Sequence, residues 1–220
     1  RIQKHTLSVT PIFIWKPELN YENSDYTIIS QWNMSFTNSS ELRFSMFNRY
    51  TFLYDGFDPT RTDATPLLGN KGYAYTSFEA RYQSDRRKQF SYNVSPSIGQ
   101  FYNGKKYSIE GRLNWRLQPY FQTNIQINYN KIELPNPYPT ASIWLVGPRF
   151  DVTFNKSLFW NTLIQYNNQG ESLSVNSRIQ WRFAPLSDLF IAYNDNYNTV
   201  TSLSPRFRSI NLKLSYWLNL

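Results

Sequence analysis

Residues 210–220 read Ile-Asn-Leu-Lys-Leu-Ser-Tyr-Trp-Leu-Asn-Leu, and this stretch decides the fold. Every second residue from Ile210 to Leu220 is apolar or aromatic, and most of the residues between them are polar. Successive side chains of a β-strand point to opposite sides, so this alternation predicts a strand with one apolar and one polar face. The spacing typical of an amphipathic helix is nearly absent from the chain.

The same alternation recurs from one end of the chain to the other. We expect roughly 12 strands, most of them long enough to cross a membrane at a tilt. They are centred on residues 3–16, 26–36, 42–52, 78–82, 88–102, 106–117, 119–131, 148–154, 158–166, 172–183, 189–193 and 210–220. The first strand is the least regular, because Pro11 lacks the N–H group that a central strand needs.

The connections between the strands give a second, independent indication. Short turns are expected at residues 37–40, 84–86, 118–119, 155–156 and 184–187. They alternate with generally longer segments at residues 16–25, 55–72, 102–105, 131–140, 167–171 and 198–206. Brief periplasmic turns and longer extracellular loops are typical of outer-membrane barrels, and an even strand number would place both chain ends in the periplasm. The longest loop, 55–72, is the candidate for folding into the pore or contacting a partner.

Composition fits this interpretation. The 220 residues are enough for one domain, and 18% of them are aromatic. Mean hydropathy is only −0.57, as expected when apolar and polar faces average out along each strand. Cysteine is absent, which excludes disulfides and thiolate metal sites. The chain begins at Arg1, so we expect a processed chain or part of a longer protein.

A soluble barrel or sandwich would show the same alternation, with its apolar face inside. Long polar side chains on the polar face favour a wet interior instead, and Tyr and Trp near the ends of the apolar stripes favour membrane interfaces. None of the residues assigned to the apolar stripes is charged. We therefore predict an all-β fold, an antiparallel transmembrane β-barrel of the bacterial outer membrane, which could be part of a larger barrel.

Charged residues on the polar face are the candidate site. The predicted lumen-lining residues are Arg43, Arg49, Glu79, Arg81, Glu110, Arg112, Arg116, Arg149, Asp151, Arg178 and Arg182. Arginines outnumber acids among them, which predicts an anion-leaning pore if the lumen is open. If the lumen is plugged, the same residues would be packing and pairing groups.

Catalysis, metal binding and cofactor binding are not expected. The only histidine is His5, on the doubtful first strand, and a His-based triad or metal site needs more than that. Lumen carboxylates such as Glu110 and Asp151 could act as an acid/base pair in a hydrolase, which is one alternative. We expect Glu79, Glu110, Asp151 and Asp188 instead to belong to a ladder of charges, in which each pairs across neighbouring strands with Arg81, Arg112, Arg149 or Arg182. The basic residues are spread through strands rather than clustered, so nucleic acid is not expected as a partner.

Several motifs in roughly the last two-thirds of the chain resemble one family. The motif residues are Gln165, Tyr166 and Asn167; Asn176, Arg178 and Trp181; Pro185, Ser187, Asp188, Leu189 and Phe190; Tyr193 and Asn194; the turn 84–88; and Gly99, Phe101, Tyr102 and Gly104. They are similar to the C-terminal barrel of an uncharacterised outer-membrane family of Bacteroidetes-type bacteria. Members of that family join an N-terminal carbohydrate-binding (family 9)-like module to the barrel. The resemblance implies that such a module, and with it any glycan contact, is missing from this sequence.

These observations predict a non-enzymatic outer-membrane barrel. It would act as a channel, or as a membrane anchor or subunit of an outer-membrane complex. The second alternative is a purely structural partner in a larger outer-membrane assembly. The expected partners are outer-membrane lipid and other proteins of such a complex.

Overall fold

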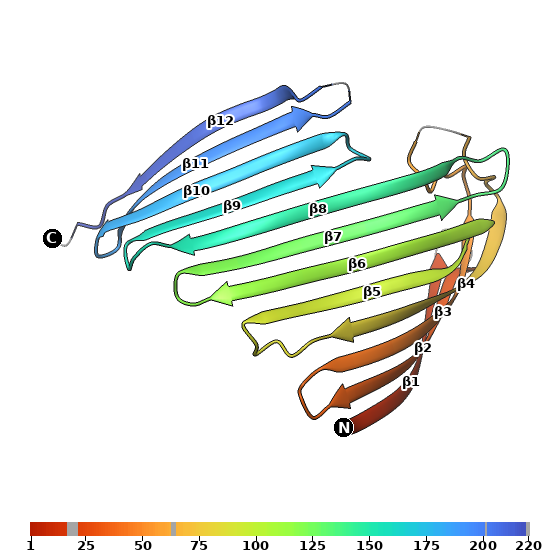
Figure 1. The fold of residues 1–220 in the computed structure, drawn as a ribbon. Coiled ribbons are helices and arrows are strands. Elements are labelled where there is room, and N and C mark those ends of the chain that lie inside the picture. The colour runs from red at the N-terminus through yellow and green to blue at the C-terminus, as the bar shows by residue number, and fades with distance from the viewer. Residues whose placement is uncertain (17–21, 63–64, 201, 219–220) are drawn as a thin grey trace. The chain divides into compact units, whose positions relative to one another are not determined.

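The computed structural model describes residues 1–16, 22–62, 65–200 and 202–218. It is all-β, with 12 antiparallel strands in one sheet whose order follows the chain (Figure 1). The strands are β1 (Ile2–Lys16), β2 (Glu22–Phe36), β3 (Glu41–Leu53), β4 (Lys71–Gln83), β5 (Phe90–Phe101), β6 (Gly104–Leu117), β7 (Phe121–Glu133), β8 (Thr140–Thr153), β9 (Leu158–Asn167), β10 (Ser172–Ala184), β11 (Ser187–Asn198) and β12 (Ser204–Ser215). The predicted all-β class, antiparallel pairing and strand number are thus confirmed.

The two edges of the sheet are β1 and β12, and no pairing joins them among the described residues. Closure into a barrel therefore stays a prediction. Pro11 does not interrupt β1, where it lies opposite Ile28 of β2. An edge strand has a neighbour on one side only, so a residue without an N–H group is tolerated there. In the described part of the chain, no helix is long and apolar enough to span a membrane.

The strand predicted over residues 210–220 is shifted in the structure. β12 begins earlier, at Ser204, and ends at Ser215, which lies opposite Asp188 near the start of β11. Beyond this point β11 offers almost no further partners, so the chain leaves the sheet. The Trp217 N–H then donates to the Ser187 hydroxyl at 3.1 Å. Residues 219 and 220 of the predicted strand lie outside the described residues, as do 17–21, 63–64 and 201 of the predicted loops.

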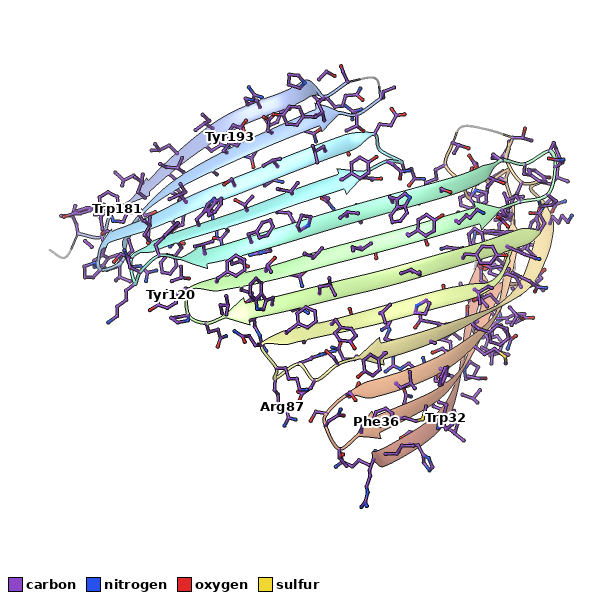
Figure 2. All side chains as sticks on the ribbon, viewed as in Figure 1. Trp32, Phe36, Arg87, Tyr120, Trp181 and Tyr193 are labelled. Carbon is purple, nitrogen blue, oxygen red and sulfur yellow. The ribbon has the colours of Figure 1, made fainter. Side chains whose placement is uncertain are left out.

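Two compact units divide the chain, and each is described by itself. Unit 1 comprises Arg1–Arg86, Asn93–Glu110 and Asn128–Ile143, and unit 2 comprises Arg87–Tyr92, Gly111–Ile127 and Trp144–Leu220. In both units, side chains project from both sides of the strands along their length (Figure 2).

In unit 1 the strand register separates apolar from polar side chains. Trp32 lies opposite Phe44 on one side of the sheet, which we call the apolar face of unit 1. The neighbouring residues Asn33 and Arg43 form the next pair, on the polar face of unit 1, and Arg43 in turn lies opposite Arg81. Large side chains of the apolar face are well exposed, including Phe78 at 53%. The alternation predicted from the sequence therefore sorts the residues of β2–β4 as expected.

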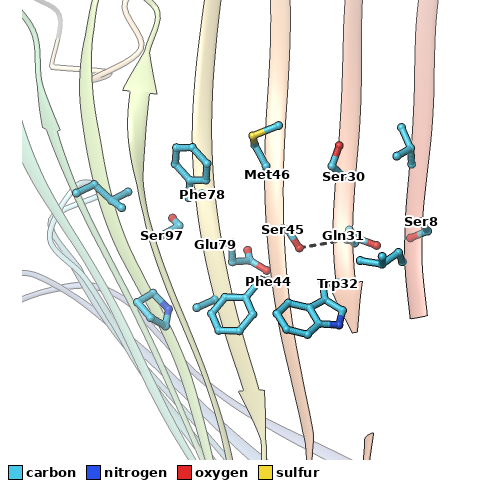
Figure 3. Close-up of a pocket in the computed structure, with 15 residues that line it drawn as sticks. Ser8, Ser30, Gln31, Trp32, Phe44, Ser45, Met46, Phe78, Glu79 and Ser97 are labelled. Carbon is cyan, nitrogen blue, oxygen red and sulfur yellow. Dashed lines mark hydrogen bonds between the residues drawn. The ribbon is translucent and has the colours of Figure 1, made fainter. Parts of the chain in front are cut away.

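An open groove of about 790 Å³ lies on the apolar face of unit 1 (Figure 3). Large side chains, Trp32, Phe44 and Phe78 among them, stand around small ones such as Ser30 and Ala80. The groove exists because the small side chains form its floor and the large side chains form its walls. Its lining is almost entirely apolar, so water is a poor occupant of it.

Unit 2 shows the same division into two faces. Ile179 lies opposite Trp160 on one side and Ile191 on the other, and together they define the apolar face of unit 2. Arg178 lies opposite Asn161, which in turn lies opposite Asp151, and these define the polar face of unit 2.

Candidate functional site

The predicted lumen-lining residues lie on the polar faces. Those of unit 1 are Arg43, Arg49, Glu79, Arg81 and Glu110. Those of unit 2 are Arg149, Asp151, Arg178, Arg182, Arg112 and Arg116, the last two flanking Asn114 at two-residue spacing on β6. Within each unit these residues therefore share one side of the sheet, and the lumen they would line stays a prediction.

Three of the four acids expected in the ladder of charges form an ion pair with one of its arginines among the described residues. Arg81 lies 3.5 Å from Glu79, Arg149 lies 3.2 Å from Asp151, and Arg182 lies 3.3 Å from Asp188. The first two pairs join residues of one strand, so the expected pairing across neighbouring strands is confirmed only for the third. Their arginines are about half exposed, so each pair contributes little to stability and mainly fixes a side-chain direction.

Amide side chains tie the polar faces together across neighbouring strands. In unit 1, the Arg43 guanidinium donates to the Asn33 side-chain oxygen at 2.5 Å. In unit 2, the Asn124 amide donates to Asn114 at 2.5 Å, and the Gln180 amide donates to Asp188 at 3.0 Å. Cross-strand pairs of this kind order polar side chains into a fixed lining.

The longest connection, of which residues 54–62 and 65–70 are described, packs onto one end of the polar face of unit 1. Leu67 is 0% exposed and forms a hydrophobic cluster with Tyr73, Tyr75, Ile132 and Leu134, which we call the capping cluster. Backbone hydrogen bonds run both ways between Phe57 and Leu67, at 3.2 and 2.8 Å, and close the loop on itself. The sequence predicted that this loop folds into a pore or contacts a partner, and the structure places it against its own sheet.

Tyr102, in the turn between β5 and β6, packs against the capping cluster and is the centre of its aromatic contacts. Its ring centroid lies 4.9 Å from that of Phe101, 5.4 Å from that of Tyr75 and 5.5 Å from that of Tyr73. Burial, with smaller contributions from the nearby Tyr75 and Asp25, raises the pKa of Tyr102 to about 12. The phenol therefore stays neutral at physiological pH, as a packed apolar cap requires.

An aspartate-centred turn shapes the start of the same loop. One oxygen of Asp58 accepts hydrogen bonds from the Thr60 N–H at 2.8 Å and from the Thr60 hydroxyl at 2.6 Å. The other oxygen accepts from the Thr62 N–H at 2.9 Å. Burial would raise the pKa of Asp58, but these hydrogen bonds outweigh it and hold the pKa below the ordinary value. The ionised carboxylate thus stabilises this turn.

A polar pocket of about 270 Å³ lies on the polar face of unit 1, next to the cap. Its lining residues are Phe47, Arg49, Tyr75, Ser77, Glu79, Ser95, Ser97, Ile98, Gln100, Phe101, Lys106, Ser108, Glu110 and Asn130. Small residues make the hollow, because Ser77 lies opposite Gly99 and a side chain on Gly99 would collide with the Ser77 backbone. Three of the predicted lumen-lining residues meet here: Arg49, Glu79 and Glu110.

Protein-family models, curated proteins and solved structures give no match to this chain. The resemblance to the outer-membrane family therefore stays a prediction. Within the described residues, no group of three or more His, Asp or Glu side chains is placed to hold a metal ion.

One charged cluster was missed because it lies on the apolar side. Asp195 and Arg208 pair across β11 and β12 on the apolar face of unit 2, in line with Tyr193. The Asp195 carboxylate accepts hydrogen bonds from the Tyr193 hydroxyl at 2.5 Å and the Tyr197 hydroxyl at 2.6 Å. The apolar stripe predicted for this strand ended at Tyr193, so it did not include this charge. Extending the parity of Tyr193 by two residues would have found Asp195.

Other polar groups on the apolar faces also satisfy one another. In unit 1, the Thr76 hydroxyl donates to the Asn48 side-chain oxygen at 2.8 Å. In unit 2, the Trp160 indole N–H donates to the Ser177 hydroxyl at 2.8 Å, and Thr162 lies 2.9 Å from the same oxygen. A polar group facing hydrocarbon needs such a partner, because lipid offers none.

Proposed function

We propose that the chain is an outer-membrane β-barrel whose polar faces line a wet interior that conducts small anionic solutes. Residues 54–70 narrow one end of this interior. Both chain ends and the short turns face the periplasm, and the long loops face outward.

The exposed apolar faces carry the proposal. Trp32, Phe78 and Ile98 in unit 1 are 42–55% exposed, and Leu212 in unit 2 is 68% exposed. A water-facing sheet would place such side chains on its covered side, and here they form contiguous faces that include an open apolar groove. Exposure of such a face to lipid carries no free-energy penalty, unlike its exposure to water.

The placement of the cap argues against a soluble barrel or sandwich. In either of those folds the polar face would point to water. The capping cluster of unit 1 instead buries Leu67 against the polar face, which suits a face that lies inside. A loop folded onto an interior wall is a recognised use of long barrel loops.

Aromatic pairs near both ends of the strands add support. On the apolar face of unit 1, the Tyr26 and Tyr50 rings stack with centroids 5.5 Å apart, close to one end of β2 and β3. Trp32 and Phe44 meet at 6.2 Å near the other end. In unit 2, Trp181 and Phe183 meet at 5.7 Å beside the turn after β10. Amphipathic rings at both ends are typical of membrane interfaces.

A membrane anchor is the second candidate, and the cap is the observation that favours it. If residues 54–70 close the interior, the barrel would hold a partner or an upstream module in place and conduct nothing. The hydrolase alternative gains no support from Asp151, whose carboxylate already accepts hydrogen bonds from Arg149 at 3.2 Å and Asn161 at 2.5 Å.

Single-channel recording in a planar bilayer tests the proposal. The folded protein is compared with a variant in which residues 57–67 are replaced by a short Gly/Ser linker. We expect an anion-selective reversal potential, with a larger conductance in the variant. A folded barrel that conducts in neither form would overturn the channel and leave the anchor. Failure to insert into liposomes at all would overturn the membrane location.

A further inference from the structure

The polar pocket of unit 1 is bordered by two cations from strands that are not neighbours. Arg49 belongs to β3 and Lys106 to β6, with β4 and β5 between them. Strand spacing places their backbones about 14 Å apart. Both side chains border the same pocket over a floor of small residues, where Ser77 lies opposite Gly99. Long cationic side chains on either side of such a floor can converge on one bound molecule.

Neither cation forms an ion pair with a described residue, although Glu110 borders the same pocket and attracts Lys106 from beyond ion-pair distance. The Arg49 guanidinium lies 4.4 Å from the centre of the Phe47 ring and donates to the Ser77 hydroxyl at 2.9 Å. The Lys106 ammonium lies 5.2 Å from the centre of the Phe101 ring. The ion pairs among the described residues include neither of them. An aromatic face orients a cation without removing its net charge, so both keep N–H donors for an anion.

The rest of the lining suits hydroxyl groups. Ser97, Ser108 and Asn130 border the pocket, and the Ser108 hydroxyl donates to the Asn130 side-chain oxygen at 2.8 Å. Glu110 adds a carboxylate that can accept hydrogen bonds. At about 270 Å³ the pocket lies just below the range of drug-sized sites, a size that suits a single-ring solute.

We propose that this pocket binds a small hydroxylated carboxylic acid the size of a sugar acid. Arg49 and Lys106 hold its carboxylate, and Ser97, Ser108, Asn130 and Glu110 hydrogen-bond its hydroxyls. This inference rests on the proposed function, because it requires the polar face of unit 1 to line a wet interior. It narrows the solute class from small anions to polyhydroxylated ones.

Calorimetric titration of the folded protein in detergent micelles tests the proposal, with glucuronate, glucose and acetate as probes. We expect saturable binding of glucuronate at least tenfold tighter than that of glucose, which lacks the charge, and of acetate, which lacks the hydroxyls. Arg49→Gln and Lys106→Gln should each weaken glucuronate at least tenfold.

Arg43→Gln is the matched control, since Arg43 lies on the same face of unit 1 and outside the pocket lining. It should change the affinity less than twofold. Folding of every variant is checked by circular dichroism and by the heat-dependent gel shift of a folded barrel. Absent glucuronate binding by folded wild-type protein, equal affinity for glucose, or an equal loss in the control would overturn the proposal. The titration needs no bilayer, so it can fail while conductance succeeds, and the reverse.

Discussion

The Asp195 carboxylate lies 2.8 Å from the Arg208 guanidinium on the apolar face of unit 2, and their side chains are 1% and 54% exposed. The Asp195 carboxylate is thus buried, whereas the Arg208 guanidinium that neutralises it stays exposed. A buried carboxylate is tolerated only when donors and an opposite charge surround it. Two tyrosine hydroxyls and the Arg208 guanidinium all donate to one carboxylate oxygen, Oδ2, whereas the buried Oδ1 has no hydrogen-bond partner among the described residues.

Arg208→Ala should destabilise the fold more than any conservative surface change, because it leaves Asp195 buried without a counter-charge. Removing both charges together, as Asp195→Leu with Arg208→Leu, should restore most of the loss. The urea midpoint of unfolding, followed by the gel shift in micelles, measures both. An Arg208→Ala variant as stable as the wild type would show that the pair is dispensable.

Leu67→Ala should release the cap from the polar face of unit 1. Leu67 is fully buried, and deleting a buried leucine side chain costs about 2–5 kcal/mol. We expect faster amide exchange in residues 54–70 and a higher, noisier conductance. Leu68→Ala is the matched control, since Leu68 is 61% exposed and should tolerate the change. Equal effects of the two substitutions would contradict the role given to Leu67.

Asp58 should make the start of the same loop sensitive to acid. Its pKa is lowered from the ordinary value of 3.8 by hydrogen bonds that outweigh burial. A lowered pKa in the folded state stabilises the loop fully above the ordinary value, and this stabilisation is lost as pH falls through the folded value. Hydrogen-exchange mass spectrometry should show loss of protection at residues 58–62 below about pH 4. In Asp58→Asn the protection should be weaker at neutral pH, and this acid step should disappear. An acid step that persists in Asp58→Asn would assign it to another group.

Neighbouring residues on opposite faces offer a direct test of which face meets lipid. Phe44→Arg should disfavour insertion by about 2–4 kcal/mol, as expected for a cation placed on the lipid side of a barrel. Gln31→Arg, on the polar face next to Trp32 and opposite Ser45, should insert normally, because Gln31 is only partly buried. Refolding yield into liposomes measures both. The opposite ranking of the two variants would place the polar face outside and support a soluble-type arrangement.

The strands could be predicted from the sequence because the alternation of apolar and polar residues recurs in nearly every segment. Alternation located β3, β6 and β10 closely, and parity placed Arg43 and Arg178 on the polar side of their units. Strand ends were predicted less well. The last strand ends at Ser215 although the alternation continues, because strand length depends on a partner that periodicity does not reveal.

The capping cluster and the polar pocket of unit 1 could not be predicted from the alternation of apolar and polar residues. Leu67 lies in an irregular segment, so no periodic pattern marks it as buried. Tyr73 and Tyr75 did carry a signal, since they are aromatic residues at polar parity near one end of β4. Arg49 and Lys106 border one pocket because only β4 and β5 separate their strands in the sheet. The distance between the two residues along the chain does not predict this.

The order of the sheet, in which each strand pairs with its neighbours in the chain, also bears on how the protein folds. Contacts between neighbours in sequence form quickly, and the entropy lost on closing a loop grows only slowly with its length. The sheet can therefore grow one hairpin at a time. Among these hairpins, β3–β4 must close over the longest connection. We expect it to be the slowest to form, and the packing of Leu67 to stabilise it only after the strands have met.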